Sequence, residues 1–268
     1  MTTLAHAIRL PAPRLARAEL LKLRKRRGLV ATIALATIGA SVITYGILAI
    51  LHAVNPAHHG PAGGVANLGH GLWVLSTLGA VAATLIGATA GAGDLSAGVF
   101  RELVVTGRSR RALFRARIPG GLALLLTFVV AGYAITAVAT VVFAGGLAVP
   151  SASLLAKTGA WLVLSVTFYF LLALGLASLL GSRSTTIGAL LAFRLALTPL
   201  LTSIAAFGVG RELVPGAALE RLMPHALREF ARMGGNVPMS VGAAEVVLVA
   251  WAVALLALGA WRTITRDA

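Results

Sequence analysis

Six long apolar segments, separated by short polar connections, dominate this sequence. They cover approximately residues 28–51, 72–93, 119–144, 159–180, 186–207 and 241–261. A helix needs about 20 consecutive apolar residues to cross the ~30 Å hydrocarbon core of a bilayer, because all its backbone polar groups must be satisfied within the segment. The segments are continuous Ala, Leu, Val and Gly runs and lack the apolar–polar alternation of membrane β-strands. The sequence therefore predicts an all-α polytopic membrane protein with six transmembrane helices.

The basic residues fall mainly on one side of the predicted spans. Residues 9–27 contain eight of the 23 Lys and Arg, residues 101–117 contain six, and Arg183, Arg262 and Arg266 lie on the same side. The other side has Lys157, Arg211, Arg221, Arg228 and Arg232. By the positive-inside rule we expect both termini in the cytoplasm. Topology and contact with anionic lipids account for the formal net charge of +15, so we expect membrane lipids and no nucleic acid as partners.

Several kinds of site are excluded or disfavoured by composition. The chain has no cysteine, which excludes disulfides, thiolate metal sites and cysteine nucleophiles. His52, His58, His59 and His70 fall in the first outer loop without Cys, Asp or Glu nearby, so we expect no metal site. The first apolar run is too long for a cleaved signal peptide, and we expect it to target the chain to a bacterial inner membrane.

The arm of residues 1–27 precedes the membrane domain of residues 28–268. Within it, residues 13–27 mix Leu15, Leu20, Leu21 and Leu23 with seven basic residues. An amphipathic helix lying in the headgroup plane would place these leucines toward the acyl chains and the basic residues toward phosphates. The alternative is a basic flank that only fixes the topology.

The connection between the second and third spans contains a short predicted helix, residues 99–106. Asp94 and Ser96 are suitable N-terminal caps, and Gly107 is suited to end the helix in a left-handed conformation. The apolar face of this helix is either tucked under the bundle or bound by another protein.

This plan resembles the membrane subunit of ABC exporters of the type 2 permease family. Such subunits have a basic amphipathic helix, six spans with both ends inside and a coupling helix between spans two and three. The matching positions here are Asp94, Gly98, the 99–106 helix, Gly107, Ser109-Arg110 and Leu113 to Arg117. The family often has Pro before its Ser-Arg turn, where this chain has Gly107-Arg108.

The resemblance implies two protein partners. A separate ABC ATPase subunit would bind the coupling helix, through Val99, Phe100, Arg101, Glu102, Leu103 and Val104. A second copy or a sister permease subunit would complete the membrane domain. The sequence has no Gly-rich loop ending in GK[ST], so we expect this chain to bind no cofactor and the partner to hold ATP and Mg. The expected cargo is a hydrophobic or amphipathic drug, antibiotic, peptide or lipid.

A second hypothesis is a motor-free membrane protein, either an immunity or anchoring protein or an intramembrane enzyme. An enzyme would need a Ser/His pair, a carboxylate dyad or a metal cluster within the spans. Glu245 is the one carboxylate clearly inside a span, and we expect it to be structural, paired with Lys157 or an outer Arg, or exposed to interfacial water. We therefore expect no catalytic residues in this chain.

Arg194 lies inside the fifth span, with Pro199 one turn later. A charge near the bilayer centre costs at least about 2.5 kcal/mol and normally faces a partner or a wet cavity. We predict that Arg194 and Pro199 line a translocation path, Arg194 holding a polar or anionic group and Pro199 kinking the helix. The alternatives are a pair with Asp94 or a helix C-terminal carbonyl, or snorkelling of the side chain to the headgroups.

Small residues recur four apart on the second span, at Gly79, Ala83, Gly87 and Gly91, and again at Ala173, Ala177 and Gly181. This spacing favours close helix packing in lipid, either within one subunit or between two.

The outer connection of residues 208–240 has apolar residues at helical spacing, and Pro215 and Pro224 should divide it into short helices. The resemblance implies an outer gate here, to which we assign Leu219, Leu222 and Met223. An ordinary amphipathic surface loop is the alternative.

Overall fold

The computed structural model describes residues 12–98, 105, 109–228 and 237–265. Every regular element in this part of the chain is helical. Six of the helices are long and apolar enough to span a membrane: Arg27–Val54, Gly64–Ser96, Arg110–Val142, Ala152–Leu180, Arg183–Ser203 and Val241–Thr265. The prediction of an all-α protein with six candidate membrane spans is confirmed, and the orientation of its termini stays a prediction.

Two of the spans contain a π-helical turn. The first consists of α2 (Arg27–Ala34), a π turn (Leu35–Gly39) and α3 (Ala40–Val54). The fifth consists of α8 (Arg183–Ala192), a π turn (Phe193–Leu197) and α9 (Thr198–Ser203). The others are single helices: α4 (Gly64–Ser96), α6 (Arg110–Val142), α7 (Ala152–Leu180) and α12 (Val241–Thr265).

The shorter helices precede the first span or lie between the last two spans. The helix α1 (Ala12–Arg24) precedes the first span. The 3-10 helix η3 (Ala205–Leu213), α10 (Pro215–Leu222) and the 3-10 helix η4 (His225–Leu227) lie between the last two spans. We call the end of the bundle that contains α1 and the turn between α7 and α8 the α1 end, and the end with the loops 55–63 and 143–151 the opposite end.

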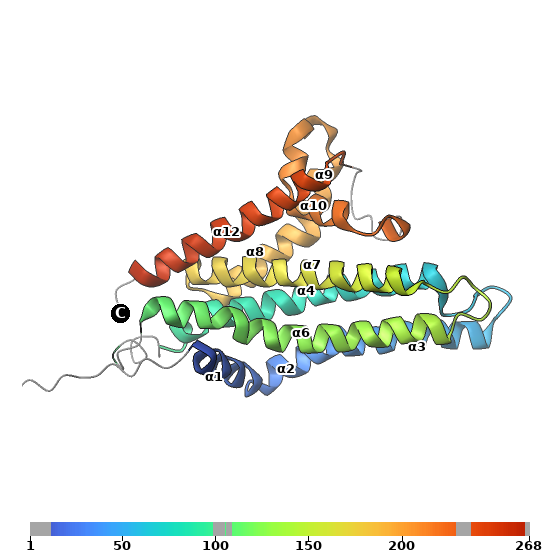
Figure 1. Cartoon of the computed structure of the whole chain (residues 1–268), viewed down its shortest axis with the longest axis horizontal. Coiled ribbons are helices and arrows are strands. Elements are labelled where there is room, and N and C mark those ends of the chain that lie inside the picture. The colour runs from blue at the N-terminus through green and yellow to red at the C-terminus, as the bar shows by residue number, and fades with distance from the viewer. Residues whose placement is uncertain (1–11, 99–104, 106–108, 229–236, 266–268) are drawn as a thin grey trace, which may run out of the picture.

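Figure 1 shows α3, α4, α6 and α7 side by side and nearly parallel, while α8, α9 and α12 diverge from them toward the opposite end. The divergence starts from a close crossing of α7 and α12 near the α1 end. A Cβ added at Gly175 would lie 2.5 Å from the Leu255 carbonyl oxygen, and one at Gly259 would lie 2.5 Å from the Gly175 carbonyl oxygen. The space that opens farther along α12 is occupied by α10, which packs against it.

The helices α4 and α6 are longer than the predicted spans. Each has 33 residues, a length of about 50 Å at 1.5 Å per residue. The third span was predicted to begin at about Pro119, and α6 starts before that residue. The helix begins at Arg110, where the Ser109 hydroxyl accepts a hydrogen bond from the Ala112 N–H at 3.1 Å. A proline inside a membrane helix is tolerated where neighbouring groups satisfy the freed backbone carbonyl.

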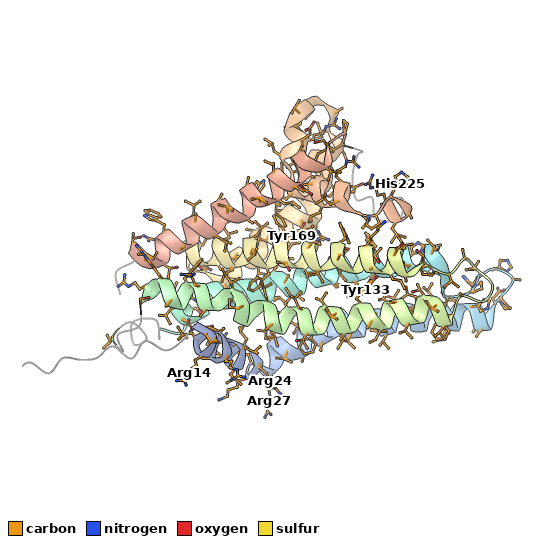
Figure 2. All side chains as sticks on the ribbon, in the orientation of Figure 1. Arg14, Arg24, Arg27, Tyr133, Tyr169 and His225 are labelled. Atoms are coloured by element: carbon orange, nitrogen blue, oxygen red, sulfur yellow. The ribbon has the colours of Figure 1, made fainter. Side chains whose placement is uncertain are left out.

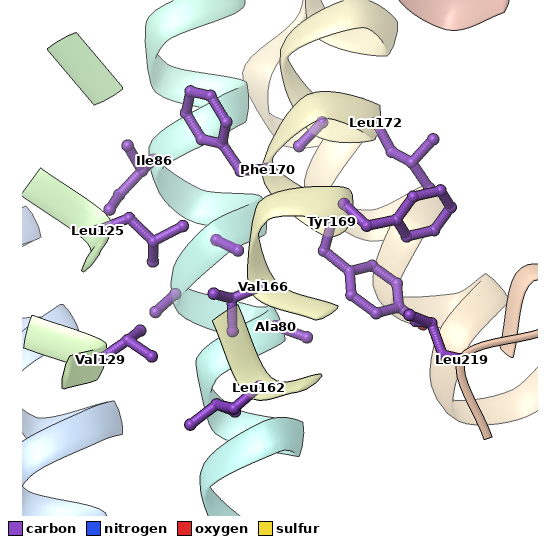
Figure 3. Packing of buried hydrophobic residues seen from close by; sticks show 14 of the residues in the cluster. Ala80, Ile86, Leu125, Val129, Leu162, Val166, Tyr169, Phe170, Leu172 and Leu219 are labelled. Atoms are coloured by element: carbon purple, nitrogen blue, oxygen red, sulfur yellow. The ribbon is translucent and has the colours of Figure 1, made fainter. Parts of the chain in front are cut away.

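The fold is centred on the contact between α4 and α7. In each of them 67% of the most apolar window is buried, against 11% in α12. A Cβ added at Gly87 would lie 2.5 Å from the Phe170 carbonyl oxygen, and one at Gly91 would lie 2.7 Å from the Ala177 Cβ. Figure 3 shows Phe170 of α7 beside Ile86 of α4, and Val166 nearer to Ala80.

The predicted packing residues therefore lie within one chain. Gly79 faces Val166, Ala83 is fully buried, and Gly87 and Gly91 face the small residues of α7. Gly181 has a different role from the one that its spacing suggested. It ends α7 in the left-handed conformation (φ 72°), and its N–H donates to the Ala177 carbonyl oxygen at 2.8 Å, which allows a tight turn into α8.

We predict that Gly87→Ala destabilises the bundle, because the added methyl group overlaps the backbone of α7. The free energy of unfolding should fall by about 1–3 kcal/mol. Denaturant unfolding of the purified protein in lipid or detergent measures it. The matched control is Gly46→Ala, where no atom lies within 4 Å of the added Cβ. Equal stability of the two variants would contradict the packing argument.

Orientation can be measured directly because the natural chain has no cysteine. We predict that a membrane-impermeant maleimide labels Asn55→Cys in intact cells but labels Ser184→Cys only after lysis. Both positions are exposed and lie at opposite ends of the bundle. The reverse labelling pattern would place the basic end outside.

Candidate functional site

Four charged side chains meet where α1, α4 and α6 come together at the α1 end. Asp94 of α4 accepts hydrogen bonds from Lys22 of α1 at 2.9 and 3.1 Å and from Arg117 of α6 at 3.1 Å. The Lys22 Nζ also lies 2.6 Å from a carboxylate oxygen of Glu19. We call Glu19, Lys22, Asp94 and Arg117 the charge cluster.

The charge cluster is largely buried. Asp94 is 3% exposed and Arg117 is 1% exposed. Arg117 also donates to the Gly91 carbonyl oxygen at 3.1 Å. Buried charges are costly unless they are paired and hydrogen-bonded. Here α4 supplies the carboxylate, and α1 and α6 supply the cations that pair with it. The cluster therefore ties α1 to the ends of α4 and α6.

The amphipathic α1 packs on the bundle, mainly on α6. Leu15 and Leu23 are buried, so the expectation that they face acyl chains is wrong for these two, whereas Leu21 is 53% exposed. The approach is close because α6 has a glycine there: a Cβ at Gly120 would lie 2.7 Å from the Glu19 Cβ. In Figure 2, Arg14, Arg24 and Arg27 point away from the other helices.

Two residues of the charge cluster lie on either side of the connection between α4 and α6. Asp94 is the third-last residue of α4 and Arg117 is the eighth residue of α6. The prediction that Asp94 caps a coupling helix is wrong, because its carboxylate binds Lys22 and Arg117. The coupling residues predicted between them lie outside the described residues: Val99, Phe100, Arg101, Glu102, Leu103 and Val104.

Arg194 is a second arginine inside the bundle, at the π turn of the fifth span. It lies about 16 Å along the helix from Arg183. Its Nη1 donates to the Tyr169 hydroxyl at 2.7 Å, its Nη2 lies 3.4 Å from the Ser76 carbonyl oxygen, and its Cζ lies 4.6 Å from the centre of the Tyr169 ring. These contacts hold the guanidinium beside α4 and α7, so it does not snorkel to the headgroups. The alternative pair with Asp94 is wrong, because Asp94 belongs to the charge cluster.

Pro199 lies two residues after the last residue of the π turn. Proline lacks an N–H and its ring crowds the carbonyl four residues earlier, which here is that of Leu195 in the π turn (Phe193–Leu197). The wider turn accommodates both changes. Such π turns inside α-helices are frequent at functional sites.

A cavity of about 60 Å³ adjoins Arg194, which we call the Arg194 cavity. Helices α4, α7, α9 and α10 contribute to its wall. Its polar lining includes Ser76, Ser165, Arg194 and Thr198, and its apolar lining includes Trp73, Trp161, Leu219 and Met223. The predicted path residue Arg194 and two of the predicted gate residues are thus brought together.

The helix α10, which contains the predicted gate residues Leu219 and Leu222, lies beside the spans. The Trp161 Nε1 donates to the Leu219 carbonyl oxygen at 2.8 Å, and Trp161 is about 14 Å along α7 from Ala152. Leu219 and Met223 are buried at 3% and 2% exposure, and Leu222 is half-buried.

The prolines of this connection lie at the ends of α10, as the sequence suggested. Pro215 begins the helix and Pro224 follows it. Sequence reasoning missed Gly216. A Cβ there would lie 2.2 Å from the Thr198 Cγ2, so only glycine lets α10 approach α9. With 30 glycines in the chain, its composition gave no signal for this one.

A larger groove of about 530 Å³ lies between α7, α12 and the end of α10. Its walls are mainly apolar, with Lys157 and Glu245 among the lining residues. Both side chains are exposed, and no ion pair joins them in the part of the chain that the structure describes. The expected pair of Glu245 with Lys157 is therefore wrong, and Glu245 faces outward.

His52 and His58 contact residues of the 55–63 loop. The Nδ1 of His52 lies 2.7 Å from the His59 carbonyl oxygen, and the Nδ1 of His58 lies 3.2 Å from the Asn55 side-chain oxygen. Among the described residues, no three His, Cys, Asp or Glu side chains are grouped so that they could hold a metal ion.

Comparisons with known proteins identify no family for this chain. No protein-family model matches it, and no curated protein sequence matches it. The chain is a polytopic, all-helical protein with six membrane-length apolar helices.

We predict that Asp94→Asn destabilises the protein strongly, because it leaves Arg117 buried without a counter-ion. The loss should be about 3–5 kcal/mol. Lys22→Gln should cost about 1 kcal/mol or less, because the Lys22 side chain is 31% exposed. Thermal unfolding of purified variants measures both, with the exposed Lys25→Gln as control. A larger loss for Lys22→Gln than for Asp94→Asn would contradict this ranking.

Proposed function

We propose that this chain is the membrane subunit of an ATP-driven ABC exporter that moves a hydrophobic or amphipathic compound by alternating access. The observation that carries the proposal is the charge cluster. It joins the basic amphipathic α1 to the two helix ends that flank the connection of residues 97–109. A force applied to that connection would act on α1, α4 and α6 together.

The other end of the molecule supports a gated path. The helix α10 is inserted beside α7 and α12, and it lines both the Arg194 cavity and the apolar groove. The π turn and Pro199 interrupt the regular helix at the same level. Such interruptions in membrane helices occur where the backbone lines a cavity or a binding site.

The proposal includes two partners. The ATPase would be a separate polypeptide that docks on residues 97–109. A second copy or a sister subunit would pack on the least buried spans, of which α12 has 11% and the fifth span has 22% of its apolar window buried within the chain. A two-fold arrangement would place the path between the two membrane subunits.

The proposal is tested by purifying the tagged chain from its native membrane. We predict that a nucleotide-binding subunit co-purifies with the natural chain and is lost with the double variant Phe100→Asp, Leu103→Asp. The control is Phe143→Asp, Val149→Asp, which adds the same charges at exposed apolar positions of the opposite end. Absence of any ATPase from the natural chain, across detergents and nucleotides, would overturn the proposal in favour of a motor-free protein.

A further inference from the structure

Arg117 and Arg194, the two arginines described above inside the bundle, differ in the charge of their partners. Arg117 is paired with the carboxylate of Asp94. The partners of Arg194 are all neutral: the hydroxyl and the ring of Tyr169, and the Ser76 carbonyl oxygen at 3.4 Å. Glu220 also lines the Arg194 cavity and has interactions of its own, but no ion pair joins it to Arg194 in the described part of the chain. Within those residues, the positive charge in the middle of the fifth span therefore lacks a counter-ion.

Hydrogen-bond donors at the same place are unused. The Arg194 Nε and the Thr198 Oγ1 are both buried and have no partner among the described residues. Both residues line the Arg194 cavity. Buried polar groups are normally satisfied, and an unsatisfied pair beside a cavity indicates a missing acceptor. Carboxylates and phosphates are the acceptors that fit best, because two of their oxygens can accept from the N–H groups of one planar guanidinium.

The size of the cavity limits what enters it. A volume of about 60 Å³ holds about four water-sized groups, enough for a carboxylate and the first atoms of its chain. The cavity is partly open, and its wall includes two indole rings, Trp73 and Trp161. Leu195 and Leu197, in the same turn as Arg194, are exposed toward the surroundings of the bundle. A longer ligand would thus place its apolar part along membrane-facing surface.

We propose that the Arg194 cavity binds the oxyanion headgroup, a carboxylate or phosphate, of an otherwise apolar molecule. Arg194 supplies the charge and Thr198 a hydroxyl donor, while Trp73 and Trp161 enclose the first carbons of the chain. Leu219 of α10 and Met223, which follows this helix, cover the site, so displacement of α10 would release the headgroup toward the opposite end. That the bound molecule is a transported substrate rests on the proposed function. Binding of the headgroup in the cavity requires no ATPase.

Binding is tested by quenching of tryptophan fluorescence in the purified full-length chain, held in phosphatidylcholine nanodiscs. The background variant Trp251→Phe, Trp261→Phe leaves Trp73 and Trp161 as the two remaining tryptophans of the four in the chain. The probe is 2-bromododecanoate, whose bromine quenches indoles that it touches and lies beside the carboxylate. Its methyl ester is the uncharged control, and bromoacetate represents a small free anion.

We expect saturable quenching by 2-bromododecanoate, with a half-saturating concentration that rises at least tenfold in Arg194→Gln. The ester and bromoacetate should each bind at least tenfold more weakly than the acid. The matched control Lys25→Gln, which removes an exposed cation away from both the cavity and the groove, should leave the value unchanged. If Arg194→Gln fails to fold, Thr198→Val replaces only the hydroxyl by a methyl group and should weaken binding about tenfold, the effect of losing one hydrogen bond to a charged acceptor.

Three results would overturn the inference: equal binding by Arg194→Gln, binding of the ester as tight as that of the acid, or binding of bromoacetate as tight as that of the long-chain acid. Because the assay contains no ATPase, its failure is distinct from failure of the co-purification experiment. Tight binding without a co-purifying ATPase would keep the headgroup site and reject the exporter.

Discussion

The close contact between α4 and α7 is the interaction on which the rest of the structure depends. In a bilayer the surroundings of a helix are as apolar as its neighbours, so helices associate where small residues let their backbones approach. Gly87 and Gly91 bring α4 against Phe170 and Ala177 of α7 with no room for a Cβ. The other spans pack around this pair, and α12 approaches α7 most closely where its Gly259 meets Gly175 of α7.

Because α12 approaches α7 most closely near the α1 end, the two ends of the molecule differ. At the α1 end the helices are held together by the buried charge cluster, in which Asp94 bridges Lys22 and Arg117. At the opposite end α12 has diverged from α7, and the gap contains α10 and the apolar groove. The Arg194 cavity lies beside this gap, between α4, α7, α9 and α10. One end is suited to transmit a displacement as a unit, and the other is suited to change shape.

The same contrast is visible in the interior arginines. Arg117 with Asp94 forms a compensated pair, which is costly to break and makes a firm joint. Arg194 has a hydroxyl and a ring as partners but no carboxylate among the described residues. A charge that lies in a cavity without a counter-ion destabilises the fold. A ligand of the opposite charge would compensate it.

The predictions that the structure confirms depend mainly on the bilayer and on local backbone chemistry. The run length of apolar residues predicted six helical spans, because backbone hydrogen bonds in hydrocarbon leave few other solutions. Pro215 and Pro224 correctly indicated the ends of α10, because proline acts on the backbone beside it. Span boundaries were harder to predict. The apolar run predicted from about Pro119 does not show where α6 begins, because a polar, Arg-rich turn continues the helix outside that run.

Partners of individual side chains depended on contacts between distant parts of the chain. Asp94 was available to a helix cap, to Arg194 or to another cation, and only the docking of α1 on Gly120 brought Lys22 within reach. Gly216 could not be distinguished from the other glycines until α10 was placed against Thr198. The sequence by itself determined the helices, because their hydrogen bonds are local. Only the tertiary structure decided which charges are paired and where the cavity lies, because these depend on the crossing points of helices far apart in the chain.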